Sequence, residues 1–169
     1  MHSLEQSSRL PVAAAQVWAR AVTEEGINDE LRPVLRMTMP RALRGKTIDE
    51  VEVGKPLGRS WILLGGLLPV DYDDLLLAEL EPGRRFLERS RMLTFAVWQH
   101  ERIVETDGDE GCCVTDRLGF ELRSAVAWIP GMTWLARTII AALFRHRHRR
   151  LRRHHGDRRL PVAPADQSS

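Results

Sequence analysis

The sequence has few of the residues that redox, metal or disulfide chemistry needs. Its only cysteines are the neighbours Cys112 and Cys113. Adjacent cysteines on a strand point to opposite faces and can bridge only with strain. There is no C-x-x-C pair and no Cys/His spacing typical of a metal site. We therefore expect reduced, structural cysteines, no metal and no cofactor, as is typical of a cytoplasmic protein.

Long apolar runs are also lacking. The longest, Trp61 to Val70, is far shorter than the roughly 20 residues of a membrane span, and the N-terminal region has no apolar core of a secretory signal. Within this run, Gly65 and Gly66 do not belong to a phosphate-binding G-x-x-x-x-G-K-[ST] loop. Paired glycines in a strand instead predict a bulge or a sharp bend.

The composition is that of a folded domain with one strongly basic segment. The chain has 169 residues, of which 43% are hydrophobic and 28% charged, and these values predict a single domain with a sizeable core. We place the domain at residues 1–156 and a flexible tail at 157–169. Residues 144–159 carry eight arginines and one aspartate, a charge of +7, so the rest of this chain of net charge +2 sums to −5.

The basic segment, which includes Arg145–Arg153, allows three interpretations. Cations favour the C-terminal end of a helix through its dipole, so the segment can be a solvated helix end. It can also contact an anionic membrane surface or another acidic partner, with Phe144 and Leu151 as anchors. Nucleic-acid binding is disfavoured, because no helix-turn-helix or finger pattern accompanies the arginines.

The order of expected elements is one strand, two short helices, a run of strands and one long helix. Alternation predicts a strand over Ser3–Leu10, and Pro11 marks the start of a helix that ends at Gly26. A second short helix follows an Asn28 cap. Residues 41–58 read as a loop, and residues 59–123 as hairpin-linked strands with turns at 69–73, 81–84 and 107–111.

Helical periodicity returns after Ile129 and continues to about His154. One stripe of this helix holds Met132, Leu135, Ile139, Ala142 or Leu143, and His146. Grouped strands with segregated helices indicate an α+β fold in which this single long helix covers a curved antiparallel sheet.

Three stretches resemble the START-like helix-grip superfamily, also called SRPBCC. "LPVAAAQVWARAV" is similar to its first strand running into its first helix, "WQHERIV" with "GCCVTDRLGFEL" to its paired late strands, and "LFRHRHRRLRR" to the end of its last helix. The resemblance covers almost the whole chain. It implies a helix-grip fold, with a curved antiparallel sheet wrapped around the C-terminal helix.

Members of this superfamily hold a cavity between the sheet and the long helix. The resemblance implies a ligand that is apolar, such as a lipid or polyketide, and in a few members a cyclisation or dehydration. Tryptophans at inward positions serve either as core packing or as cavity walls. The expected lining is Trp61, Leu63, Trp98, His100, Asp116, Phe120, Met132, Leu135 and Ile139.

Two polar residues of the late strands are candidates for a site. With the turn at 107–110, the residue numbers of directly opposed positions sum to 216 or 217. The register with a sum of 216 gathers the apolar residues of both strands on one buried face. His100 then lies directly opposite Asp116, within hydrogen-bonding reach. The pair can be purely structural, can orient a ligand, or can act as general base and orienter; no nucleophile or oxyanion donors accompany it.

We therefore expect a protein that binds a hydrophobic small molecule in an internal cavity. The alternative is a cyclase or dehydratase that uses His100 and Asp116. A second alternative is an interaction protein that docks its basic helix on an anionic surface. The sequence leaves the ligand and the oligomeric state open.

Overall fold

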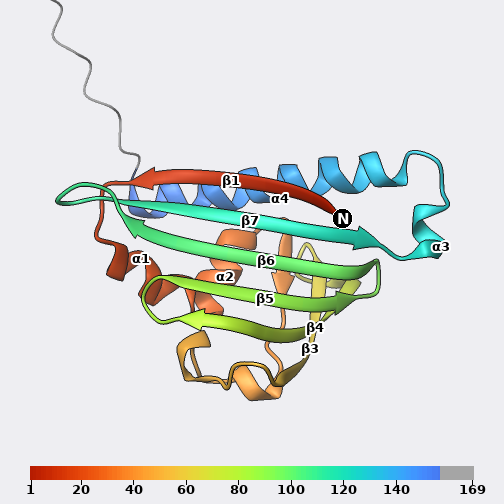
Figure 1. Cartoon of the computed structure of the whole chain (residues 1–169), viewed down its shortest axis with the longest axis horizontal. Helices are drawn as coiled ribbons and strands as arrows, with labels where there is room; N and C mark the ends of the chain where they lie inside the picture. The colour runs from red at the N-terminus through yellow and green to blue at the C-terminus, as the bar shows by residue number, and fades with distance from the viewer. Residues whose placement is uncertain (157–169) are drawn as a thin grey trace, which may run out of the picture.

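The computed structural model describes residues 1–156, which form a curved seven-stranded antiparallel sheet covered on one face by helices (Figure 1). Each neighbouring pair of strands is antiparallel, in the order β1-β7-β6-β5-β4-β3-β2. The strands are β1 His2–Leu10, β2 Leu35–Met37, β3 Pro56–Leu64, β4 Leu68–Glu81, β5 Arg85–Met92, β6 Phe95–Thr106 and β7 Cys112–Leu122. The predicted α+β helix-grip arrangement is confirmed.

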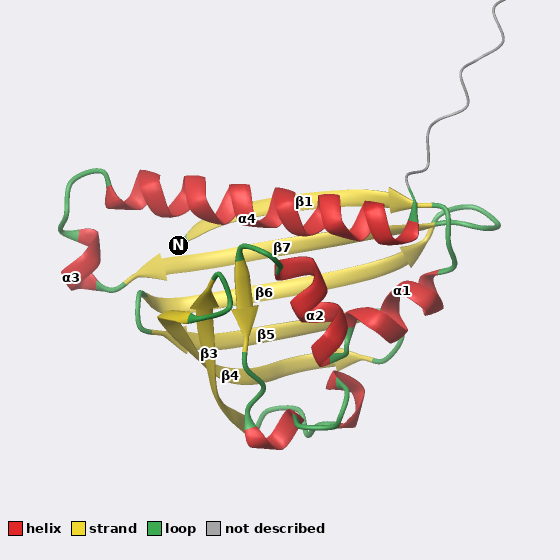
Figure 2. Ribbon diagram, turned by 180° about the vertical axis from the view of Figure 1, so that it is seen from behind, coloured by secondary structure: helices red, strands yellow, loops and turns green. Residues whose placement is uncertain are grey.

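Three of the four helices in residues 1–156 lie on the concave side of this sheet, and the short third helix lies beyond the end of β7. The helices are α1 Ala14–Ala21, α2 Glu24–Leu31, the short α3 Ser124–Ala127 and the 24-residue α4 Met132–His155, with two 3-10 turns at Arg41–Leu43 and Ile48–Glu50. Figure 2 shows α4 running beside β1, with α1 and α2 near its C-terminal end. The predicted single C-terminal helix is confirmed, and the predicted tail at 157–169 lies outside the described residues.

The β6–β7 hairpin has the predicted faces but a different register. From Val97 onward the residue numbers of its pairs sum to 218, so that Val104 faces Val114, His100 faces Leu118 and Arg102 faces Asp116. The predicted sum of 216 is wrong because Thr106 pairs with Cys112, which leaves all five residues 107–111 in the turn. A shift of two residues keeps every side chain on its face, which is why the buried face was predicted correctly.

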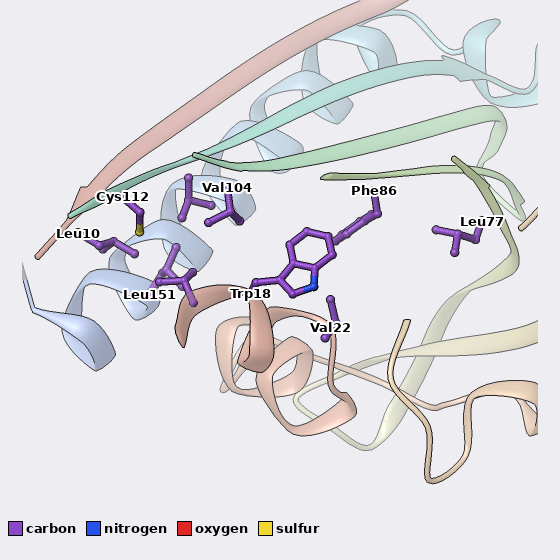
Figure 3. Close-up of a cluster of buried hydrophobic side chains, with 10 residues drawn as sticks. Leu10, Trp18, Val22, Leu77, Phe86, Val104, Cys112 and Leu151 are labelled. Atoms are coloured by element: carbon purple, nitrogen blue, oxygen red, sulfur yellow. The ribbon is translucent and has the colours of Figure 1, made fainter. Parts of the chain in front are cut away.

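Among the described residues, the core contains three clusters of buried apolar residues, and two of them include side chains of α4. Figure 3 shows the cluster between α1, the C-terminal turns of α4 and the sheet, where Trp18 lies between Val22 and Phe86. The indole N–H of Trp18 donates to Asp49 Oδ2 at 2.8 Å, which satisfies its one polar group. The second cluster packs α4 on the other end of the sheet through Met92, Phe95, Leu118, Phe120, Ala136, Ile140 and Phe144.

The buried stripe of α4 is not the predicted one. The helix buries Ala136, Ile140, Phe144, Arg147, His148 and Leu151. Leu135 and Ile139, expected to face inward, are 42% and 56% exposed. Residues 134–144 offer apolar side chains on adjacent stripes, so the periodicity alone did not fix the rotation of the helix.

Several local expectations also need correction. Gly65 and Gly66 both have positive φ and form the turn between β3 and β4, where two left-handed residues suit a tight hairpin, so they do not bend a strand. The turn expected at 69–73 lies inside β4, and β2 was not anticipated. The second helix begins after Thr23, whose Oγ1 accepts from the Gly26 N–H, so Gly26 is inside the helix and Asn28 is not its cap.

Candidate functional site

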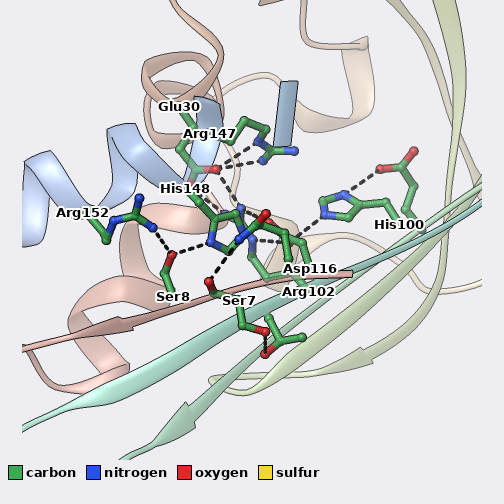
Figure 4. A network of polar contacts seen from close by, with 12 residues as sticks. Ser7, Ser8, Glu30, His100, Arg102, Asp116, Arg147, His148 and Arg152 are labelled. Carbon is green, nitrogen blue, oxygen red and sulfur yellow. Dashed lines mark hydrogen bonds and ion pairs between the residues drawn. The ribbon is translucent and has the colours of Figure 1, made fainter. Parts of the chain in front are cut away.

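The Asp116 carboxylate is the centre of a buried polar network (Figure 4). It comes from the middle of β7 and is fully buried. Its Oδ1 accepts from Arg102 Nε at 2.8 Å and lies 2.9 Å from His100 Nε2. Its Oδ2 accepts from Arg102 Nη2 at 2.7 Å and lies 3.0 Å from His148 Nε2. The predicted hydrogen bond between His100 and Asp116 is present, but Arg102 is the residue directly opposite Asp116.

A second carboxylate, Glu30 of α2, completes the charge balance of the network. Arg102 Nη1 and Nη2 donate to its two oxygens at 2.7 and 2.8 Å. Arg147 of α4 donates to Glu30 Oε2 through Nε at 3.1 Å and Nη2 at 2.9 Å. Two guanidinium groups thus neutralise two carboxylates, and the network joins β6, β7, α2 and α4.

The arginines keep both buried carboxylates ionised. Burial by itself raises the pKa of Asp116, but the charge and hydrogen bonds of Arg102 outweigh it and hold that pKa well below its ordinary value. Burial likewise raises the pKa of Glu30, and Arg102 together with Arg147 lowers it below its ordinary value. Asp116 and Glu30 are therefore carboxylates paired with arginines and not protonated acids.

Much of the basic helix end points into the protein. His148 Nδ1 lies 2.8 Å from Ser8 Oγ, which accepts from Arg152 at 2.7 Å, and His148 Nε2 lies 3.0 Å from Asp116 Oδ2. Arg150 donates to Asp29 Oδ1 at 2.7 Å. Of the predicted anionic-surface contact Arg145–Arg153, half of the arginines are thus used for internal contacts, and Arg145, Arg149 and Arg153 remain exposed.

Next to the network, a cavity of about 130 Å³ lies between the sheet and the helices. Most of its wall is apolar and comes from α1, α2, β2 to β6 and α4. The apolar lining is Ala21, Ile27, Leu31, Leu35, Met37, Met39, Leu43, Ile48, Ile62, Leu75, Phe86, Met92, Trp98, Leu143 and Phe144. A wider depression of about 690 Å³ between β1 and α4 opens to the outside and offers less burial to a ligand.

One side of the cavity wall is polar. It is formed by His100, Glu88, Asp73 and Arg147. Ser90 Oγ donates to Glu88 Oε1 at 2.8 Å, and Glu88 Oε2 is 4.0 Å from His100 Nδ1. His100 also packs edge-on against the rings of Phe86 and Phe144.

Asp73 is the least satisfied group of this wall. It is only 3% exposed, and its Oδ1 has no hydrogen-bond partner among residues 1–156. Burial, followed by the negative charge and hydrogen bond of Glu88, raises the pKa of Asp73 well above its ordinary value. Asp73 is therefore a carboxyl group that tends to keep its proton.

The structure brings two of the nine predicted lining residues, Trp98 and His100, to the cavity. Asp116 and Phe120 are fully buried behind the wall. Trp61 is 46% exposed, and Leu135 and Ile139 face outward. Leu63 and Met132 are half-buried away from the cavity.

Sequence reasoning missed Asp73, Glu88, Glu30 and Arg147. A signal existed for the first two. Asp73 alternates with Leu75 and Leu77 on β4, and Glu88 alternates with Phe86 and Met92 on β5, so each is a polar residue on an apolar face. Glu30 and Arg147 gave no such signal, because their partners lie on distant elements.

Several solved structures share the helix-grip fold of this chain. A START superfamily protein from Mycobacterium smegmatis matches with a TM-score of 0.61 and 10% identity, over 91% of this chain and 99% of that one. The protein CV1439 from Chromobacterium violaceum matches with a TM-score of 0.67 and 11% identity, over 92% of this chain and 98% of that one. A third match is a norcoclaurine synthase mutant from Thalictrum, in complex with a transition-state analogue. Its TM-score is 0.58 and its identity 11%, over 90% of this chain and 95% of that one.

The chain belongs to the family described as domain of unknown function DUF8410, whose model matches residues 8–155. No curated protein matches the chain in sequence. In the part of the chain that the structure describes, no helix is long and apolar enough to cross a membrane. The same residues contain no group of three or more His, Cys, Asp and Glu side chains that could hold a metal ion.

Proposed function

We propose that this protein binds a small hydrophobic molecule in the cavity between the sheet and α4. The observation that carries the proposal is the mostly apolar wall, interrupted on one side by His100, Glu88 and Asp73. An apolar surface with a few convergent polar groups is typical of a small-molecule site, because the apolar part provides affinity and the polar part fixes orientation.

The size of the cavity limits the ligand. About 130 Å³ is less than the roughly 300 Å³ at the lower end of ligand pockets. An apolar cavity of about 150 Å³ takes up benzene. The cavity therefore suits a molecule with one ring or a short branched chain, and a larger lipid or polyketide would require α4 or β2 to move outward.

The contacts of His100 favour binding over catalysis by the His100–Asp116 pair. Asp116 already has four close protein contacts and does not reach the cavity. The Nε2 of His100 is engaged by Asp116, and its Nδ1 faces Glu88. A general base needs a nitrogen free to take a proton from the substrate. In our proposal, Asp116 therefore holds the His100 ring in place on the cavity wall.

Tryptophan fluorescence tests the proposal. Among the five tryptophans, Trp98 alone lines the cavity, so saturation with ethylbenzene should change its emission and raise the melting temperature. Trp98→Phe should remove the emission change, whereas Trp134→Phe, at an exposed position, should retain it.

A cavity-filling variant gives an independent control. Leu35→Phe on the edge strand β2 places extra volume in the cavity and should abolish binding. Leu64→Phe changes its strand partner, which lies outside the lining, and should leave binding intact. Native mass spectrometry of protein from its own host then identifies the natural ligand. No emission change, no stabilisation and no co-purifying mass would refute the proposal.

A further inference from the structure

The polar wall of the cavity has an excess of carboxyl groups. In the adjacent network, Arg102 and Arg147 balance Glu30 and Asp116. Neither guanidinium is then left to neutralise Asp73 or Glu88. The nearest basic group to Glu88 is the imidazole of His100, whose Nδ1 is 4.0 Å away.

This excess is costly without a ligand. A buried carboxylate without a counter-charge is unfavourable and tends to hold a proton. The charged groups around Asp73 are Asp71 on its own strand, Glu88 on β5, and His100 and Arg147 facing the cavity. Asp71 and Glu88 both raise the pKa of Asp73, after burial itself. The buried Oδ1 of Asp73 without a partner is the second sign of an unfilled interaction.

We propose that the cavity binds a small apolar amine, with the ring or alkyl part against Trp98 and Phe86 and the ammonium group between Asp73 and Glu88. This inference rests on the proposed function, because it assigns the chemical class of the ligand in the same cavity. An ammonium group has three N–H donors and a positive charge. It supplies both the donor that Asp73 Oδ1 lacks and the counter-charge that Glu88 lacks.

The same geometry disfavours an acidic ligand such as a fatty acid. A ligand carboxylate would meet two protein carboxyl groups. The cation at the wall, Arg147, already donates two hydrogen bonds to Glu30, and its Cζ lies 4.8 Å from the centre of the Phe144 ring. Binding an acid there would require breaking a buried ion pair, which is strongly unfavourable.

Amine binding should release a proton. In the free protein Asp73 tends to keep its proton, and an adjacent ammonium group favours the carboxylate form. The amine itself is charged in solution and in the site at neutral pH. Up to one proton per ligand should therefore leave the protein on binding, and this release distinguishes a charged ligand from a neutral one of equal size.

Four single-ring probes test the inference: 2-phenylethylamine, 2-phenylethanol, 3-phenylpropionate and ethylbenzene. Calorimetric titration at neutral pH should show the amine binding at least roughly tenfold more tightly than the alcohol, because hydrogen bonds to charged groups are the stronger ones. The acid should bind most weakly. Titrations in buffers of different ionisation enthalpy should show proton release for the amine alone.

Matched variants assign the effect to the two carboxyl groups. Glu88→Gln should remove most of the preference for the amine while ethylbenzene binding survives. Asp73→Asn should abolish the proton release. Asp74→Asn, the neighbouring aspartate that pairs with Arg59 and does not line the cavity, should change neither.

The outcomes separate the two proposals. If none of the four probes binds, the cavity is not a ligand site and both proposals fail. If ethylbenzene binds but the acid binds as tightly as the amine, or Glu88→Gln leaves the amine preference unchanged, the amine assignment is wrong and the proposed function stands.

Discussion

Arg102 should contribute more to stability than any exposed arginine of the same hairpin. Its side chain is 1% exposed and donates four hydrogen bonds, of 2.7 to 2.8 Å, to Asp116 and Glu30. Arg102→Met keeps similar length but leaves Asp116 without a guanidinium and Glu30 with only Arg147. Removing one partner of a buried ion pair typically costs about 3–5 kcal/mol.

The size of this effect makes it easy to measure. For a chain of this length, 1 kcal/mol corresponds to roughly 2–4 °C in melting temperature, so Arg102→Met should lower it by about 6–20 °C. Urea unfolding should give the same loss at an unchanged slope. Arg117→Met is the control: Arg117 also pairs with carboxylates, Glu5 and Glu101, but its side chain is 55% exposed, and exposed pairs contribute little.

A second substitution tests the cause. In the Arg102→Met background, Asp116→Asn removes the carboxylate that has lost its partner, and part of the stability should return. Without this recovery, the loss would come from packing and not from an uncompensated charge. If Arg102→Met shifts the melting temperature no more than Arg117→Met, the network is not a stabilising feature and our reasoning about it is refuted.

Three further predictions use stability measurements. Ile140→Ala should cost about 2–5 kcal/mol and Ile139→Ala far less, because Ile140 is 5% and Ile139 56% exposed; equal losses would mean that the helix is rotated differently. The pKa values of Asp116 and Glu30 are lowered by folding, so their stabilisation is present above the ordinary values of 3.8 and 4.5 and is lost as the pH falls through the lowered ones; acid titration should show this loss. The pKa of Asp73 is raised, so its contribution is complete below 3.8 and lost as the pH rises through the raised value; Asp73→Asn should stabilise the protein at pH 8 and not at pH 3.

The sequence alone determined which residues share a face. Alternation in β6 and β7 placed His100, Val104, Val114 and Asp116 on one buried side, because a strand has a period of two whatever its register. It did not determine the register, since pair sums of 216 and 218 differ by two residues and leave the same side chains on each face. Arg102 therefore appeared as a residue near the hairpin end and not as the direct partner of Asp116.

Periodicity determined in the same way that α4 is one helix, but not how it is rotated. The segment around Leu135, Ile139 and Ile140 is apolar on more than one side, and only the shape of the sheet decides which stripe is buried. The same rotation of the helix also buries Arg147 and His148, although the basic sequence predicted a solvated helix end.

Only the tertiary structure decided the composition of the site. Glu30 is 72 residues from Arg102 and 117 from Arg147, and Asp73 and Glu88 meet across two strands of a curved sheet. Local patterns report burial, because burial follows the period of each element. They do not report which buried charges meet, because such a charge is tolerated only where the packing of several elements supplies its partner.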